Sequence, residues 1–339
     1  MKIALNNISS SEELPVPPSL LRSLKAGFDA ISNHVGLILF PVLLDLFLWF
    51  GPRLHLETLI RSTFVQAFSM PELQTADMAD VLQAGRDLWL QVAGRFNLFS
   101  ALRSYPIGVF SLMAGISPVD SPLGKPMVWD LASIGGVLMV AILLSLAGLA
   151  AGAFYFSGVS QAALTGSIDW SGTLRRWPWT FGQVFLLAIL WLALAIAISI
   201  PFSCMFSLMM LGGVGLGRLS LLLLGGLLVW LLLPLVFSGH GIFIAGQSMW
   251  PSLRSGARLT RLTLPSTGLF LLVALLISQG LDTLWRAPGE TSWLMAIGVA
   301  GHAFVTTGLL AASFVYYQDA SRWVQQMFER MQTARQERV

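Results

Sequence analysis

Residues 131–156 read LASIGGVLMVAILLSLAGLAAGAFYF and contain no charged side chain. A helix needs about 20 predominantly apolar residues to cross the hydrocarbon core of a bilayer, and this stretch is longer. Comparable apolar runs lie at about 181–211, 219–244, 264–281 and 292–317. A sixth run, 35–50, is interrupted only by Asp45. The sequence therefore predicts an all-α membrane protein with six transmembrane helices.

The composition agrees with a chain that lies mostly in lipid. Hydrophobic residues make up 55% of the 339 residues and charged residues 11%, whereas a soluble domain carries about 25% charge. The net charge of +3 is too small to indicate nucleic acid, so we interpret it as the cytoplasmic excess of basic residues in membrane proteins. The one cysteine, Cys204, rules out an intramolecular disulfide and a multi-cysteine metal site.

Polarity divides the chain into five parts. We expect a cytoplasmic lead with an interfacial helix over 1–33, a first transmembrane helix over 34–50, an extracytoplasmic helical insertion over 51–130, a five-helix remainder of the bundle over 131–317, and a cytoplasmic amphipathic tail helix over 318–339. Inside the insertion, apolar residues recur at helical spacing near 56–64 and 78–96, which predicts two surface helices.

Basic residues gather at the ends of apolar runs that would share one side of the membrane. Six spans place both termini on that side, and by the positive-inside rule it is cytoplasmic. Tryptophan also flanks these ends, as is typical of a membrane interface. We therefore predict a lipid-interface set that contacts anionic headgroups at the cytoplasmic face of the cell (inner) membrane. Its members are Arg22, Lys25, Arg175, Arg176, Arg254, Arg258, Arg261, Trp170, Trp177, Trp179 and Trp250.

Similar short motifs recur about every 80 residues along the chain. Aromatic residues close the second, fourth and sixth apolar runs at Phe156, Phe237 and Tyr317, and a basic amphipathic stretch precedes each odd-numbered run. We interpret this pattern as three parallel repeats, each an interfacial helix followed by a helical hairpin, with the insertion placed in the first. The alternative is that aromatic and basic residues recur because every hairpin ends at two membrane interfaces.

These features resemble a group of bacterial six-span membrane families. The resemblance rests on the basic stretches before the odd-numbered runs and on the sequence Tyr316-Tyr317-Gln318-Asp319 that closes the last run. One such family is the membrane domain found beside glycerophosphodiester phosphodiesterases. The resemblance covers the spans but not the insertion, and it implies a helical membrane bundle. The phosphodiesterase catalytic domain is absent from this sequence, so no catalytic residue carries over.

Asp45 is the acidic residue that lies well inside an apolar run. An ionised carboxylate near hydrocarbon is costly, so it should face protein or water and have a partner. One interpretation is a proton or cation site. The other is a helix-end residue that accepts hydrogen bonds from the insertion, with Arg53 as a candidate neighbour.

Three histidines, His34, His240 and His302, lie in or near apolar runs. A neutral imidazole can ligate a metal, haem or chlorin. No two of these histidines have helical i, i+3 or i, i+4 spacing, so no metal site is predicted. The alternative is a packing histidine bonded to a backbone carbonyl or to a serine. His302 is the cofactor-binding candidate because it lies deepest, but the sequence as a whole predicts no cofactor.

Two glycine motifs have structural explanations. The glycine run at 212–217 differs from a dinucleotide-binding fingerprint, because Arg218 stands where the third glycine belongs, so we expect a tight turn. Gly148 and Gly152 form a GxxxG pair that permits a close helix contact, either inside the bundle or at a dimer face.

The leading functional hypothesis is a non-enzymatic membrane scaffold or accessory subunit that docks a protein partner through the insertion or the tail. Few ionisable groups lie inside the apolar runs, and such groups usually mark function in a membrane. A transporter or permease component is the first alternative, because many carriers are built from repeats. A pigment- or haem-binding subunit that uses His302 is the second.

Overall fold

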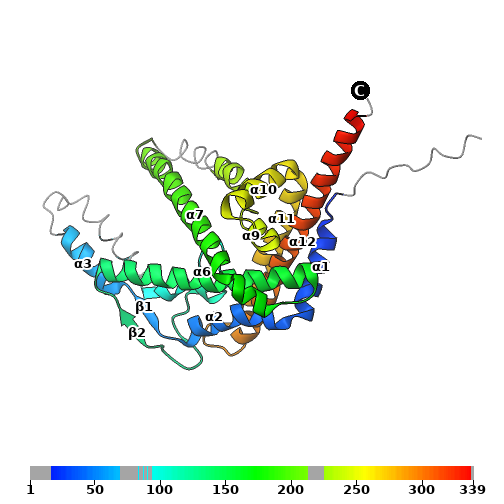
Figure 1. The fold of residues 1–339 in the computed structure, drawn as a ribbon. Coiled ribbons are helices and arrows are strands. Elements are labelled where there is room, and N and C mark those ends of the chain that lie inside the picture. Colours follow the sequence, from blue (N-terminus) through cyan, green and yellow to red (C-terminus); the bar gives the residue numbers. More distant parts are fainter. Residues whose placement is uncertain are drawn as a thin grey trace, which may run out of the picture.

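The structure is a computed structural model, and it describes residues 17–68, 83, 87, 90, 94–212 and 225–336. Helices dominate it (Figure 1). They are α1 (Leu20–Asn33), α2 (Leu39–Phe50), α3 (Glu57–Phe68), α5 (Met113–Ile116), α6 (Ile134–Thr165), α7 (Trp170–Gly212), α9 (His240–Ala245), α10 (Met249–Leu262), α11 (Leu264–Trp285) and α12 (Met295–Gln336). Short 3-10 helices are η1 (Val35–Ile38), η3 (Leu98–Leu102) and η4 (Leu233–Leu235). Strand β1 (Arg53–His55) pairs in parallel with β2 (Val128–Asp130).

Among the described residues, five helical segments are long and apolar enough to cross a membrane, and the pair formed by α1 and η1–α2 adds a sixth if it crosses as one span. The predicted all-α membrane fold is therefore confirmed. The pair bends by 91° at the break near His34, which is where the predicted interfacial helix ends and the first predicted span begins. Pro41 lies in the first turn of α2, where a missing backbone N–H is tolerated.

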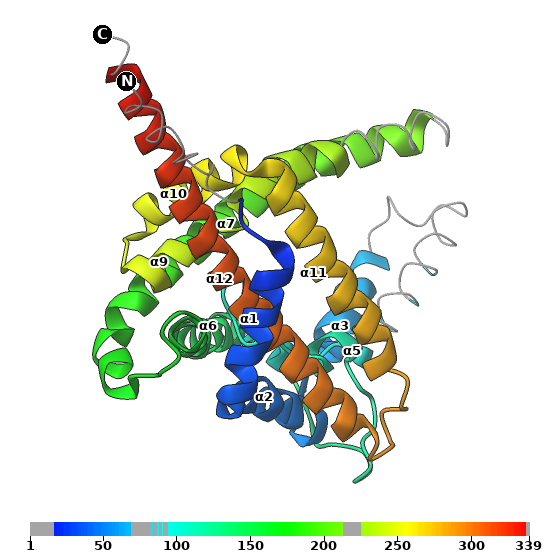
Figure 2. The ribbon, with the colours of Figure 1, turned by 90° about the vertical axis from the view of Figure 1, so that its right-hand side faces the viewer.

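Helix α12 is the central helix of the bundle. In its most apolar window 67% of residues are buried, against 11% for α7 and for α11. Helix α1 packs along it (Figure 2), and a Cβ on Gly27 would lie only 2.3 Å from the backbone nitrogen of Ala312. The second half of α7 diverges from α6 (Figure 1) and exposes apolar side chains such as Leu192 and Ile196. These exposed faces suit lipid as their surroundings.

Part of the predicted insertion lies inside the helical bundle. Ile107 and Val109 are buried in the main hydrophobic core with residues of α6, α7 and α9. Gly148 and Gly152 of α6 make room for this segment, since a Cβ on Gly152 would lie 2.7 Å from the Cα of Gly108. The GxxxG pair thus packs against the insertion, with Gly152 on the irregular backbone at Gly108 and Gly148 on Leu102 at the end of the short η3. Such backbone is tolerated at membrane depth where protein buries it.

The helices after the basic stretches differ from one another. Helices α1 and α10 end before the next helix begins, at His34 and Thr263, as an interfacial helix followed by a span requires. Helix α7 instead runs unbroken from Trp170 through the third predicted span, so no separate interfacial helix exists there. Helix α12 likewise continues from the sixth predicted span into the predicted tail. The glycine run at 213–217 and most of 78–93 lie outside the described residues, as does the side chain of Cys204.

Candidate functional site

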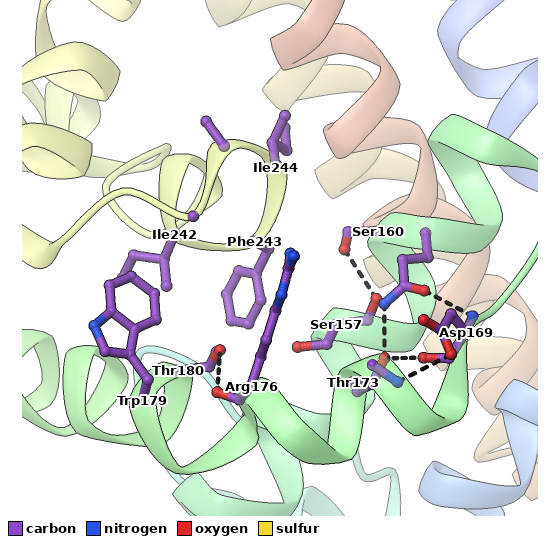
Figure 3. Close-up of a pocket in the computed structure, with 14 residues that line it drawn as sticks. Ser157, Ser160, Asp169, Thr173, Arg176, Trp179, Thr180, Ile242, Phe243 and Ile244 are labelled. Carbon is purple, nitrogen blue, oxygen red and sulfur yellow. Dashed lines mark hydrogen bonds between the residues drawn. The ribbon is translucent and has the colours of Figure 1, made fainter.

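A cavity of about 470 Å³ lies between the end of α6, the start of α7 and α9 (Figure 3). The wall formed by α9 is apolar and includes Ile242, Phe243 and Ile244. The opposite wall, from α6 and α7, is polar. Its side chains are Ser157, Ser160, Gln161, Asp169, Thr173, Arg176 and Thr180.

The polar wall of α7 follows from helical spacing. Asp169, Thr173, Arg176 and Thr180 stand at positions i, i+4, i+7 and i+11, which recur on one face of an α-helix. The apolar residues between them point elsewhere. Trp177, for example, donates from its indole nitrogen to the backbone oxygen of Ala150 at 2.9 Å. The local sequence alone therefore directs one acidic and one basic side chain toward the cavity.

Gln161 fixes the connection between α6 and α7. Its Nε2 donates to Thr173 Oγ1 at 2.7 Å, and its Oε1 accepts from the backbone nitrogen of Asp169 at 2.9 Å. Asp169 caps α7, because its Oδ1 accepts from the backbone nitrogen of Gly172 at 2.9 Å. A Cβ at position 172 would lie 2.3 Å from Asp169 Oδ2, so a larger residue there would displace the capping carboxylate. The cavity floor is thus held by bonds that neighbouring side chains supply.

Arg176 extends into the cavity between Phe243 and Ser157 (Figure 3). Across the described ranges, no carboxylate lies within 4 Å of its guanidinium. The guanidinium is a rigid fork of donors that suits phosphate and carboxylate groups. The cavity therefore presents an uncompensated cation to any ligand that enters it.

Asp45 is fully buried and accepts hydrogen bonds from the insertion. Ser111 Oγ donates to its Oδ1 at 2.5 Å, and the backbone nitrogens of Leu112 and Met113 donate at 3.1 and 2.9 Å. Arg53 is directed elsewhere, since its Nη1 donates to the backbone oxygen of Val119 at 2.6 Å. Asp45 therefore accepts hydrogen bonds from the insertion, as expected if it is a helix-end acceptor.

The three histidines have different partners. Nδ1 of His34 bonds the backbone oxygen of Ala30 at 3.0 Å, and Nε2 of His240 bonds Ser313 Oγ at 2.9 Å. Nδ1 of His302 lies 2.7 Å from Asp282 Oδ1. The buried Nε2 of His302 has no hydrogen-bond partner among the residues that the structure describes. Asp282 was not identified from the sequence as a partner of His302. Its position at the end of the fifth apolar run was the one feature that could have indicated it.

A second polar cluster ties the insertion to the loop between α11 and α12. Glu290 accepts from the backbone nitrogen of Val119 at 3.0 Å, and Trp49 Nε1 donates to the backbone oxygen of Glu290 at 2.8 Å. Burial lowers the pKa of the neighbouring Arg53 guanidinium, although Glu290 opposes the shift. Burial, followed by the charge of Arg53, lowers the pKa of His55.

The predicted lipid-interface residues lie mostly at the surface. All the basic members are exposed, as are Trp170, Trp179 and Trp250, at 44%, 45% and 55%. Trp177 is the exception, because it packs against α6. Within the described ranges, no three histidine, cysteine or acidic side chains gather where they could hold a metal ion.

Fold and site together define an all-α multi-pass membrane protein with a polar cavity at the joined ends of two candidate spans. Comparisons with protein-family models, with curated proteins and with solved structures gave no match.

Proposed function

We propose that this protein is a non-enzymatic scaffold or accessory subunit of a membrane complex in the cell (inner) membrane, with both termini cytoplasmic. One observation carries the proposal: the carboxylate of Asp45, the acidic residue well inside an apolar run, is occupied by three donors from the insertion. The buried hydroxyl of Tyr155 is likewise paired, with Thr307 Oγ1 at 2.8 Å. Groups engaged in this manner hold the fold together and leave little for chemistry.

The tail of α12 supports the proposed docking of a partner. This helix continues past the apolar window into a segment rich in charge, where Phe328 and Met331 remain 45% and 54% exposed. They stand at i, i+3 spacing, so they share one helix face. An exposed apolar pair of this kind suits a helix-in-groove contact with another protein.

Site-specific photo-crosslinking in native membranes tests this function. A photoreactive amino acid at Met331 or at Leu123 of the insertion (72% exposed) should give a discrete protein adduct of defined mass. The matched control is Leu138 of α6, which is 57% exposed but lies on a lipid-facing helix. Adducts with lipid alone at all three positions would contradict a scaffold.

A transporter component is the second candidate, and His302 favours it. Its Nε2 is buried without a described partner while its Nδ1 is bonded to Asp282, so the ring is oriented and one ring nitrogen is available to a ligand or an ion. Ion flux into liposomes that contain the purified protein distinguishes the candidates. A His302→Gln or Asp45→Asn variant that stays folded but abolishes such flux would replace the scaffold proposal. The same free nitrogen is what a haem or pigment would use, and the absorption spectrum of the purified protein tests that third function.

The three-repeat arrangement also remains a proposal, and the packing of the basic stretches supports it. Gly27 of the first stretch contacts Ala312 of α12, and Trp177 of the second bonds Ala150 of α6. Gly256 of the third fits against the backbone of Phe237, where a Cβ would lie 2.5 Å from its oxygen. The second and third basic stretches thus pack on the hairpin that precedes them in the chain, and the first packs on the last hairpin. Three similar units arranged in a ring would make these contacts.

A further inference from the structure

We propose that the cavity between α6, α7 and α9 binds the headgroup of a phosphoethanolamine-type phospholipid, with the phosphate on Arg176 and the ammonium toward Asp169. The inference goes beyond a scaffold function and does not depend on it.

The charges in the cavity fit a ligand that carries both signs. Asp169 and Arg176 are seven residues apart on one helix face, which separates their positions by about 10 Å along the axis. Their side chains make no ion pair at 4 Å or less within the described residues. A simple anion would leave the negative charge of Asp169 without a partner. A simple cation would leave the positive charge of Arg176 without one. The two-carbon spacer of phosphoethanolamine places opposite charges at the two ends of one small group.

The hydroxyl groups that line the cavity act as acceptors. Ser157 donates its proton to the backbone oxygen of Ala153 at 2.7 Å, and Thr173 donates to that of Asp169 at 2.7 Å. Thr180 likewise donates to the backbone oxygen of Arg176 at 3.2 Å. What these oxygens still offer is lone pairs, which an ammonium with three N–H donors can use. Phosphate oxygens, being acceptors themselves, find their donors on Arg176.

The cavity lies where two candidate spans end, which is where a bilayer would place its lipid headgroups. It is formed where α6 ends at Thr165 and α7 begins at Trp170, and both helices are candidate spans. From its rim a stripe of α7 runs along the helix through Trp179, Gly182 and Leu186, at i, i+3 and i+7. Trp179 and Leu186 are 45% and 46% exposed, and a Cβ on Gly182 would meet open space. Acyl chains can lie on this stripe, which favours a membrane lipid over a soluble phosphoethanolamine.

Competition between lipids of identical chain composition tests the proposal. The full-length protein is reconstituted in nanodiscs that contain equal amounts of phosphatidylethanolamine, phosphatidylcholine and phosphatidylglycerol, and retained lipid is measured by native mass spectrometry. We expect phosphatidylethanolamine to be retained about tenfold over both others, because each competitor lacks one charge-assisted hydrogen bond. Equal retention of all three, or a preference for phosphatidylglycerol, would overturn the proposal.

Three variants assign the effect to the cavity. Arg176→Gln should lower the retention of phosphatidylethanolamine about tenfold, because the phosphate loses its donors, whereas Arg175→Gln, which removes a neighbouring charge outside the cavity lining, should leave the retention unchanged. Asp169→Asn keeps a good helix cap and should lose discrimination between phosphatidylethanolamine and phosphatidylcholine. Equal losses for Arg175→Gln and Arg176→Gln would mean surface attraction only, and would overturn the site.

A soluble competitor distinguishes a membrane lipid from a free, water-soluble phosphoethanolamine compound as the ligand of the cavity. Glycerophosphoethanolamine should displace the lipid at least tenfold more weakly than phosphatidylethanolamine itself, because it cannot use the apolar stripe of α7. Equal displacement would overturn the assignment to a lipid. Thermal unfolding in detergent verifies that each variant is folded, and a photoreactive phosphatidylethanolamine should label the peptide 170–186 in wild type and in Arg175→Gln.

Discussion

Nδ1 of His302 on α12 lies 2.7 Å from Oδ1 of Asp282 on α11, and both side chains are largely buried, at 5% and 15% exposure. The bond joins two antiparallel helices near the loop that carries Glu290. It also fixes the orientation of an imidazole whose second nitrogen has no described partner.

Removing the carboxylate from this pair should destabilise the bundle. Asp282→Ala leaves a buried donor of His302 without an acceptor, which costs about 1–3 kcal/mol and should lower the unfolding midpoint in detergent. Asp29→Asn is the control, because Asp29 is an exposed acidic residue on α1. An equal midpoint for the two variants would show that the bond contributes nothing to stability.

Substitutions of Asp45 should separate loss of charge from loss of acceptors. Asp45→Asn retains one acceptor oxygen, so we expect a modest loss of stability. Asp45→Leu leaves three buried donors of the insertion unpaired and should cost about 3 kcal/mol or more. Hydrogen exchange of residues 107–113 provides the measurement, since these amides should lose protection in Asp45→Leu. Unchanged protection there would contradict the proposed anchoring role.

The docking of the insertion should weaken in acid. His55 has a folded-state pKa below its ordinary value of 6.5, because burial and the charge of Arg53 disfavour its protonated form. Its contribution to stability is therefore complete above about pH 6.5 and is lost as the pH falls, because the unfolded state then binds more protons. The unfolding midpoint should decline below this pH, and less so in His55→Gln. Identical pH profiles for the two proteins would exclude His55 as the source.

The glycines of α6 provide a steric test of the buried insertion segment. Gly152→Val should displace residues 104–109 and destabilise the protein by about 1–3 kcal/mol, because no space exists for a side chain. Gly135→Val is the matched control in the same helix, where a Cβ meets nothing within 4 Å. Cysteine accessibility at position 107 should rise only in the first variant. A stable, inaccessible Gly152→Val protein would mean that the segment packs differently.

Cysteine labelling tests the membrane topology. Cysteines near Arg175, near Arg258 or after Arg335 should react only from the cytoplasm, and cysteines near Gln83 or Gly215 only from outside. The bent pair of α1 and α2 makes position 83 decisive. Labelling of Gln83 from the cytoplasm alone would mean that the pair enters and leaves on one side, which leaves five spans.

Sequence reasoning could predict what depends on local pattern. Apolar runs located the membrane helices, and helical spacing placed the basic residues on exposed faces. It placed a helix boundary near His34 but could not predict the 91° angle there, because the direction of a helix after a break depends on what it packs against. It also placed the whole insertion outside, since a segment rich in proline and glycine such as 104–109 gives no sign that Gly148 and Gly152 will receive it.

The candidate site was visible only in part. Arg176 was identified, but as one of several interfacial basic residues, and nothing in the sequence brought α9 opposite to it. The pairing of Asp282 with His302 was missed for the same reason, since the two residues stand on different helices. Both the cavity and the pair of Asp282 with His302 depend on contacts between segments far apart in the chain. A single sequence shows no pattern from which such contacts can be predicted.

Helix α12 contains 42 residues without a break, so it is a rod of about 63 Å, roughly twice the thickness of the hydrocarbon core. Near its start Trp285 of α11 packs against Gly298 and Gly301, and further along Phe28 of α1 packs against Gly308. Further toward its C-terminal end the same helix exposes Met331 at 54%. The glycines thus hold one part of the rod tightly against α1 and α11. Because the rod is longer than the hydrocarbon core is thick, part of it must lie outside the lipid, where its exposed face is accessible to other molecules.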